Sequence, residues 1–120
     1  MVTDCLFCRM VAGEIPADVV HQTDRVFAFR DINPQAPTHV LVIPKHHHPT
    51  IGALAEADPA LLGEVVSAAQ AVARQEGLVS GDDAEPGFRL VANTGPQAGQ
   101  TVRHVHLHVL GGRNLTWPPG

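Results

Sequence analysis

The sequence is poor in basic residues and lacks a long apolar run, and both absences restrict what the protein can bind. Eight Lys and Arg against twelve Asp and Glu give a formal net charge of −4 at pH 7, and the basic residues are scattered. Proteins that hold a nucleic-acid backbone cluster positive charge on one face, so this balance argues against nucleic acid as a partner. No run approaches the roughly 18 apolar residues of a membrane span, and residues 1–4 carry no signal-peptide features. We therefore expect a cytoplasmic protein with no membrane partner.

Cysteine is also scarce, since only Cys5 and Cys8 occur. In a reducing compartment a C-x-x-C pair is more often half of a metal site or a redox pair than a structural disulfide, and an unliganded reduced pair is the remaining alternative.

Histidine is plentiful by contrast. Six of the eight histidines fall into two clusters, residues 46–48 and the alternating positions 104, 106 and 108. Because histidine titrates near neutral pH and ligates metals, we expect the chemistry at these clusters.

Length and composition predict a single domain over residues 1–120. A chain of 120 residues with 44% apolar residues can bury one core but has little room for a second. Runs rich in β-branched and aromatic residues predict five strands, at 19–22, 26–32, 39–43, 88–92 and 102–110.

Two helices are predicted around these strands. Apolar residues at helical spacing follow the cysteines and stop at Gly13, which indicates a short helix. A long amphipathic helix begins with the cap Asp58 and the first helical residue Pro59 and continues to about Glu76. The segment 80–87 is acidic, lacks periodicity and is expected to be a loop. The order of the elements favours an α+β fold, an antiparallel sheet with helices packed on one side.

The last predicted strand carries the alternating histidines. Successive strand residues point to opposite faces, so His104, His106 and His108 share one face at intervals of about 7 Å, while the apolar residues between them face the core. A neutral imidazole is a nucleophile near pH 7 and a good leaving group once it is bonded to phosphorus. Two other interpretations stay open at this point, a polar sheet face without chemistry and a His-x-His zinc site.

A loop rich in glycine and polar residues, at 93–101, leads into this strand. Gly95 and Gly99 would allow the backbone to approach an anion closely, and Asn93, Gln100 and Thr101 offer donors to phosphate oxygens. A plain flexible connection is the alternative interpretation, since glycine and threonine are common in loops.

Several short motifs follow one another along the chain. Residues 104–110, H-V-H-L-H-V-L, alternate histidines with apolar residues. Further motifs are Cys5 to Cys8, Ile15 to Ala17, Phe29 to Ile32, Ala36 to His39, Ile43 to Lys45 and Trp117 to Gly120. In this order the motifs resemble those of the histidine triad nucleotide-binding (HIT) family, in the Hint branch of nucleoside phosphoramidate hydrolases. The resemblance implies a five-stranded antiparallel sheet with one long and one short helix, and a homodimer in which two such sheets join and the long helix helps form the interface.

The resemblance also implies hydrolysis of adenosine or guanosine 5′-phosphoramidates through a covalent nucleotidyl-histidine. His106 matches the family's nucleophile, and His39, His104 and His108 match the rest of its polar site. Asp31 matches the residue that holds the ribose hydroxyls. The base would lie near the apolar residues Phe7, Phe29, Ile32 and Leu41. The phosphate and leaving group would contact Asn93, Gly99, Gln100 and Thr101.

Two positions bear on substrate choice. Thr101 stands where relatives often have serine, so it keeps the hydroxyl but adds a methyl group beside the leaving group. Trp117 is expected near the active site of the partner protomer, where it would affect specificity.

The resemblance further implies structural zinc in the bacterial type of this family. The matching ligands are Cys5, Cys8, His47 and His104, and such a Cys2His2 set leaves no open position for water. His46 or His48 remains an alternative to His47, because three adjacent histidines blur the register.

Two rival functions remain at this level. The wider superfamily includes dinucleoside polyphosphate hydrolases and nucleotidyltransferases, which use the same nucleophile with other leaving groups. The second rival, from another class, is a nucleotide-binding regulatory protein. The ending Trp117 to Gly120 favours the phosphoramidate hydrolase, and the complete set of triad histidines disfavours a purely regulatory role.

Overall fold

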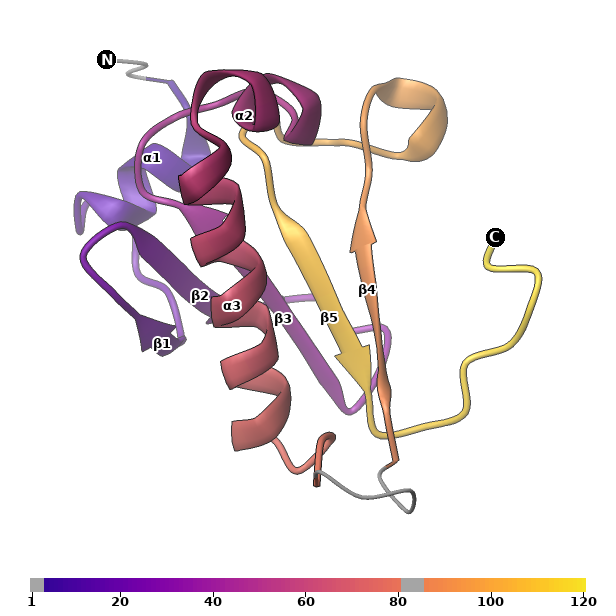
Figure 1. Ribbon diagram of the computed structural model, residues 1–120. Helices are drawn as coiled ribbons and strands as arrows, with labels where there is room; N and C mark the ends of the chain where they lie inside the picture. Colours follow the sequence, from indigo (N-terminus) through magenta and orange to yellow (C-terminus); the bar gives the residue numbers. More distant parts are fainter. Residues whose placement is uncertain (1–3, 81–85) are drawn as a thin grey trace.

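Five strands form an antiparallel sheet in a computed structural model that describes residues 4–80 and 86–120 (Figure 1). The elements are α1 (Leu6–Val11), β1 (Val19–Gln22), β2 (Val26–Arg30), β3 (Thr38–Pro44), α2 (Ile51–Ala57), α3 (Pro59–Gln75), β4 (Phe88–Ala92), the 3-10 turn η1 (Pro96–Ala98) and β5 (Leu107–Gly111). The strand order is β1-β2-β3-β5-β4, with every neighbouring pair antiparallel. The predicted α+β fold is confirmed. Most of the predicted acidic loop lies outside the described residues.

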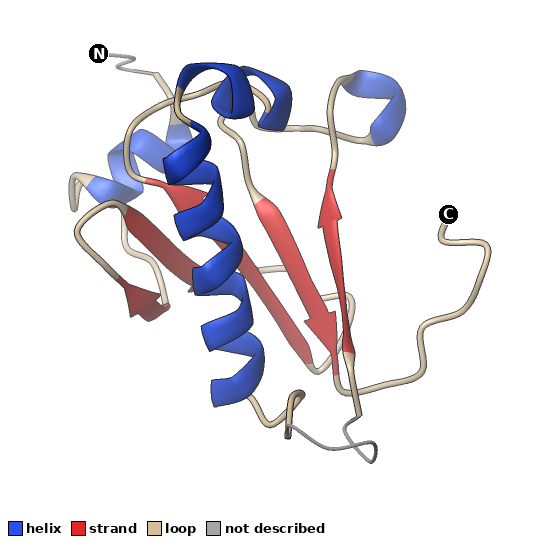
Figure 2. Ribbon diagram, in the orientation of Figure 1, coloured by secondary structure: helices blue, strands red, loops and turns tan. Residues whose placement is uncertain are grey.

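Helices cover both faces of the sheet, which differs from the one-sided arrangement predicted above. On one face, α3 packs across the strands, as Figure 2 shows, and its residues Leu61, Val65 and Val72 share a cluster with Val40 and other strand residues. On the opposite face, α1 contributes Phe7 to a second cluster with residues of β2 and β3. The reason lies in β2 and β3, because almost all their residues are buried and each face therefore needs a cover. No helix among residues 4–80 and 86–120 is long and apolar enough to cross a membrane.

Side-chain caps begin two helices in the middle of the chain. The carboxylate of Asp58 accepts a hydrogen bond from the Leu61 amide at 3.0 Å, which confirms the predicted start of α3. The preceding helix α2 was not predicted, although the Thr50 hydroxyl caps it in the same way by accepting from the Ala53 amide at 3.1 Å. Its seven residues are too few to show a helical period, so the threonine was the available signal.

The last strand is shorter than predicted and begins at Leu107, where its pairing with both β3 and β4 starts. Before it, the Val105 amide donates to the His48 carbonyl at 2.8 Å, so this segment is held by a loop instead of a neighbouring strand. The predicted alternation persists nonetheless. Val105 and Leu107 belong to the cluster under α3, whereas the rings of His106 and His108 contact each other on the other side.

Candidate functional site

Four sulfur and nitrogen donors from distant parts of the chain meet beside the start of α1. The His104 Nδ1 atom lies 3.4 Å from Cys5 Sγ and 3.6 Å from Cys8 Sγ, and His47 Nδ1 lies 3.4 Å from Cys8 Sγ. All four donor atoms lie within 4.8 Å of one another. His46 and His48 pair their rings with each other instead, at a centroid distance of 5.2 Å, so the structure places His47 in this cluster.

The cluster fits a tetrahedral zinc ion. Ligands at about 2.1–2.3 Å from zinc in a tetrahedron are about 3.5 Å apart, which agrees with the contacts above. The His104 Nε2 atom lies 2.8 Å from the Pro44 carbonyl, which only accepts hydrogen bonds, so Nε2 carries the proton and Nδ1 keeps the lone pair that a metal needs. Burial, above all, lowers the pKa of His104 to about 4, which keeps it neutral at pH 7.

Without a cation, the Cys8 side chain favours its neutral thiol form. Burial raises the pKa of the Cys8 thiol to about 11, and the hydrogen bond and charge of Cys5 act in the same direction. A divalent cation reverses this effect, because it favours the thiolate that coordinates it. With all four donors engaged the site has no open position, so a metal here stabilises the junction of α1, β3 and the loop before β5 without activating water.

A second cluster of predicted residues lines a cavity of about 210 Å³ on the face of the sheet that α1 covers. We call it the reaction cavity. Its predicted members are Phe7, Phe29, Asp31, Ile32, Leu41, Thr101, His106 and His108. Three further lining residues, Leu6, Met10 and Val102, were not predicted. Leu6 and Met10 flank predicted positions on α1, so the helical pattern was the available signal for them.

His106 presents a free nitrogen to this cavity. Its Nδ1 atom lies 2.8 Å from the His104 carbonyl oxygen, so Nδ1 donates a proton and Nε2 retains its lone pair. The ring is buried and meets the edge of Phe7 at a centroid distance of 5.2 Å. These contacts fix both the tautomer and the orientation that a nucleophilic imidazole requires.

A chain of hydrogen bonds sets the tautomer of His108. The Gln35 amide donates to His39 Nδ1 at 3.0 Å, so the proton of neutral His39 is on Nε2. That Nε2 donates to His108 Nδ1 at 2.9 Å, which leaves the His108 proton on its own Nε2. Within the described part of the chain, this Nε2 is the one buried side-chain nitrogen or oxygen that has no hydrogen-bond partner. His108 lines the reaction cavity, and its Nε2 is a buried donor without a partner.

The same tautomers argue against a metal at Asp31, His39 and His108, whose donor atoms also lie within 4.8 Å of one another. His39 Nε2 carries a proton and has no lone pair to give. The Asp31 carboxylate lies 3.5 Å from that nitrogen, and its negative charge attracts the N–H dipole of His39. We call these three residues the relay: His39 and His108 share a hydrogen bond, and Asp31 adds an electrostatic contact to His39.

The relay predicts how stability depends on pH. Burial first, then the charges of His106 and His39, lower the pKa of His108 to about 4. The unfolded chain therefore binds a proton at this residue near pH 6.5 while the folded chain does not, so stability is complete above pH 6.5 and falls as the pH drops toward 4. We expect His108→Gln to reduce the loss of unfolding free energy between pH 7 and 4.5 by at most about 2 kcal/mol. Urea unfolding of both proteins across this range measures it, and parallel curves would contradict it.

Several predicted nucleotide-binding residues do not line the reaction cavity. Asn93, Gly99 and Gln100 lie outside its lining, as does Trp117, whose side chain is 80% exposed. The Gln100 side chain is engaged with the backbone, since it donates to the carbonyls of Val102 and of the distant Pro49 and accepts from the Gly95 amide. A role for these residues in binding stays a prediction.

Comparisons with known proteins agree with this arrangement. The model of the HIT domain family matches residues 12–115. The chain is 48% identical over 120 residues to an uncharacterized HIT-like protein of Synechococcus elongatus, with all of both chains covered. It is also 48% identical over 118 residues to the 14 kDa zinc-binding protein of Zea mays, covering 96% of this chain and 87% of the maize protein. The crystal structure of a HIT family hydrolase from Legionella pneumophila matches with a TM-score of 0.89 at 50% identity, over 98% of this chain and 100% of the other. The chain therefore belongs to the HIT domain family.

Proposed function

We propose that the protein hydrolyses the P–N bond of purine nucleoside 5′-phosphoramidates through a covalent nucleotidyl intermediate on His106, as in the Hint branch. One observation carries the proposal. The free Nε2 lone pair of His106 and the unpartnered Nε2–H of His108 lie on neighbouring rings, 5.1 Å apart between centroids, at the wall of one cavity. A nucleophile beside a hydrogen-bond donor that stabilises charge on the phosphoryl oxygens favours displacement of an amine from phosphorus.

The reaction proceeds in two displacements. In the first, the His106 lone pair forms a bond to the α-phosphorus, and the P–N bond breaks with its electron pair on the departing nitrogen. That nitrogen takes a proton from solvent, while the Nε2–H of His108 donates a hydrogen bond to a nonbridging oxygen on phosphorus. In the second, water attacks phosphorus, the bond to His106 breaks and the water returns one proton to solvent. The products are the amine and the nucleoside monophosphate, so the protons balance over the cycle.

The remaining lining residues suit the nucleoside. Phe7, Phe29 and Leu41 are buried and give an apolar wall for a purine base. Asp31 reaches the same cavity with a carboxylate that can accept from ribose hydroxyls. Thr101 also lines the cavity, and its hydroxyl can donate to a nonbridging oxygen or to the leaving group.

We propose in addition that the Cys5, Cys8, His47 and His104 cluster holds structural zinc, as the name of the maize relative indicates for that protein. A reducing cytoplasm, where we place the protein, keeps both thiols available for the metal. The ion would supply a fixed anchor for His104, whose carbonyl accepts the proton of His106 Nδ1.

Mass spectrometry tests the reaction directly. The protein is mixed for milliseconds to seconds with adenosine 5′-phosphoramidate, quenched and digested. We expect the mass of a nucleotidyl group on the peptide that contains His106. Turnover without any trapped adduct, or an adduct on another residue, would overturn the proposal. Faster turnover of a dinucleoside polyphosphate than of the phosphoramidate would favour the rival hydrolase.

We also predict a symmetric homodimer of single-domain protomers. Leu90 on the edge strand β4, Val66 on α3 and Trp117 are exposed apolar side chains of the kind that a second copy would cover. Sedimentation equilibrium at micromolar concentration should give twice the mass of the chain, and a monomer mass would contradict the prediction.

Truncation after Leu115 should change the preference among leaving groups more than it changes the melting temperature.

A further inference from the structure

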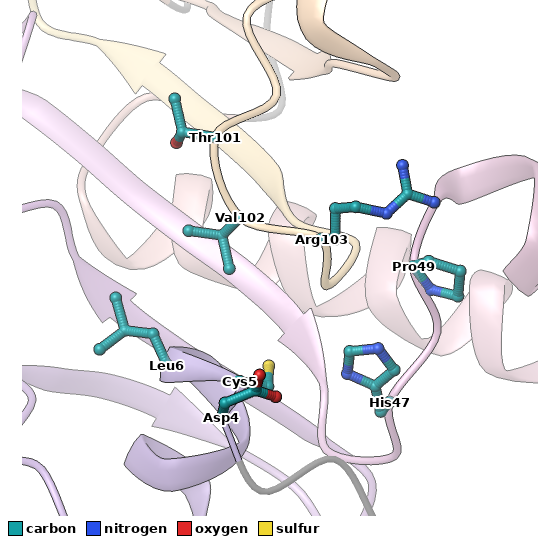
Figure 3. A pocket seen from close by; sticks show the side chains of 8 residues that line it. All are labelled: Asp4, Cys5, Leu6, His47, Pro49, Thr101, Val102 and Arg103. Carbon is teal, nitrogen blue, oxygen red and sulfur yellow. The ribbon is translucent and has the colours of Figure 1, made fainter.

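A second cavity adjoins the reaction cavity. We call it the side cavity. It has a volume of about 370 Å³ and is walled by the start of α1, the segment after β3 and the loop before β5 (Figure 3). Its lining residues are Asp4, Cys5, Leu6, His47, Pro49, Thr101, Val102 and Arg103. Leu6, Thr101 and Val102 line both cavities, so the two spaces meet at these three side chains.

The side cavity contains a guanidinium group that the structure leaves without a partner. Arg103 is exposed, and it makes no hydrogen bond or ion pair with any residue in 4–80 or 86–120. Its side chain lines this cavity and points away from Leu6 (Figure 3). A guanidinium group binds a carboxylate through two parallel hydrogen bonds. Asp4 contributes the one carboxylate of the lining and is not paired with Arg103.

The backbone around Arg103 is fixed on both sides. Two residues before it, Thr101 lines the reaction cavity, and the preceding Gln100 side chain is bonded to three backbone groups. The next residue, His104, is completely buried and belongs to the metal cluster. Because these neighbours are held, the distance from the Thr101 hydroxyl to the base of the Arg103 side chain is constrained, as a specificity group requires.

We propose that the side cavity is the subsite for the departing amine and that Arg103 selects amines that carry a carboxylate. This inference rests on the proposed function. In a displacement at phosphorus the nucleophile and the leaving group lie roughly in line on opposite sides. With phosphorus beside His106, the substituent on nitrogen points out of the reaction cavity, and the side cavity adjoins it at Thr101 and Val102. Arg103 makes and breaks no bond in the reaction. It contributes binding energy for one class of leaving group.

Two matched substrates test the subsite. They are the adenosine 5′-phosphoramidates of 3-aminopropanoate and of 3-aminopropanamide, which differ only in the charge at the end of the amine. The measured quantity is the kcat/KM value for the aminopropanoate compound divided by that for the aminopropanamide compound. Because solvent screens an exposed pair, we expect Arg103→Gln to lower this ratio by about fivefold and Arg103→Lys to lower it less. Comparing ratios between variants cancels the difference in intrinsic reactivity of the two compounds.

Arg9→Gln is the matched control, since Arg9 is exposed on α1, loses the same charge and lies outside both cavities. It should leave the ratio unchanged. Raising NaCl to half molar should lower the ratio for the unmodified protein but not for Arg103→Gln. If Arg103→Gln turns over both compounds and their ratio equals that of the unmodified protein, the proposed subsite is wrong while the proposed reaction stands. Absence of turnover and of any nucleotidyl-histidine would overturn the proposed reaction together with the subsite.

Discussion

Replacing His106 by asparagine is expected to lower the turnover of an adenosine 5′-phosphoramidate by at least about a thousandfold, because a step that needs the lone pair on Nε2 is lost. Asparagine is the informative substitution. Its amide can still donate to the His104 carbonyl that Nδ1 of His106 contacts at 2.8 Å, so the local hydrogen bond survives without the nucleophile. Turnover is followed by chromatographic release of the nucleoside monophosphate. No nucleotidyl adduct should appear on this variant.

His21→Asn is the matched control for this experiment. His21 lies on the edge strand β1 and outside the reaction cavity, so its loss removes a histidine without touching the site. It should react at the rate of the unmodified protein. Affinity of His106→Asn for adenosine monophosphate should stay within about tenfold, because the apolar wall and Asp31 are unchanged. Near-normal turnover by a correctly folded His106→Asn protein would refute the assignment of the nucleophile.

Loss of the metal cluster is expected to have the largest effect on stability. Structural zinc contributes on the order of 10 kcal/mol in small zinc-binding peptides, so loss of one of four ligands should cost several kcal/mol. For a chain of this length that corresponds to a fall in melting temperature of more than about 10 °C. We expect His47→Ala to produce this fall and to reduce bound zinc from about one ion per protomer to a small fraction. Elemental analysis and thermal unfolding measure the two quantities.

His46→Ala provides the control, since His46 is the exposed neighbour of His47 and its ring pairs with His48 away from the donor cluster. It should keep the zinc and most of the stability. His47→Ala also tests whether the metal has a catalytic role in place of the structural one. If zinc-bound water were the nucleophile, removal of zinc would abolish chemistry and no adduct would form on His106. Full zinc in His47→Ala would show that this cluster is not the metal site.

The sequence by itself determined most of the fold and many of the residues of both clusters. The start of α3 followed from Asp58 and Pro59, and the strands followed from their apolar runs, because caps and periodicity are local properties. The alternating motif predicted that histidines and apolar residues face opposite sides, and this holds even for residues 104–106, which are not part of a strand. Side-chain alternation requires only an extended backbone, so the prediction did not depend on pairing.

The tertiary structure decided which nitrogen of each histidine is available and which of three adjacent histidines meets the cysteines. The decisive contacts join residues far apart in the chain, such as Cys5 with His104, 99 positions away, and His39 with His108, 69 positions away. No local pattern encodes such pairs. It also joined the Gln100 side chain to the distant Pro49 carbonyl and placed Arg103 in the side cavity, which adjoins the reaction cavity. Those outcomes depend on distances between segments that are far apart in the sequence. These distances are fixed only when the helices pack on the sheet.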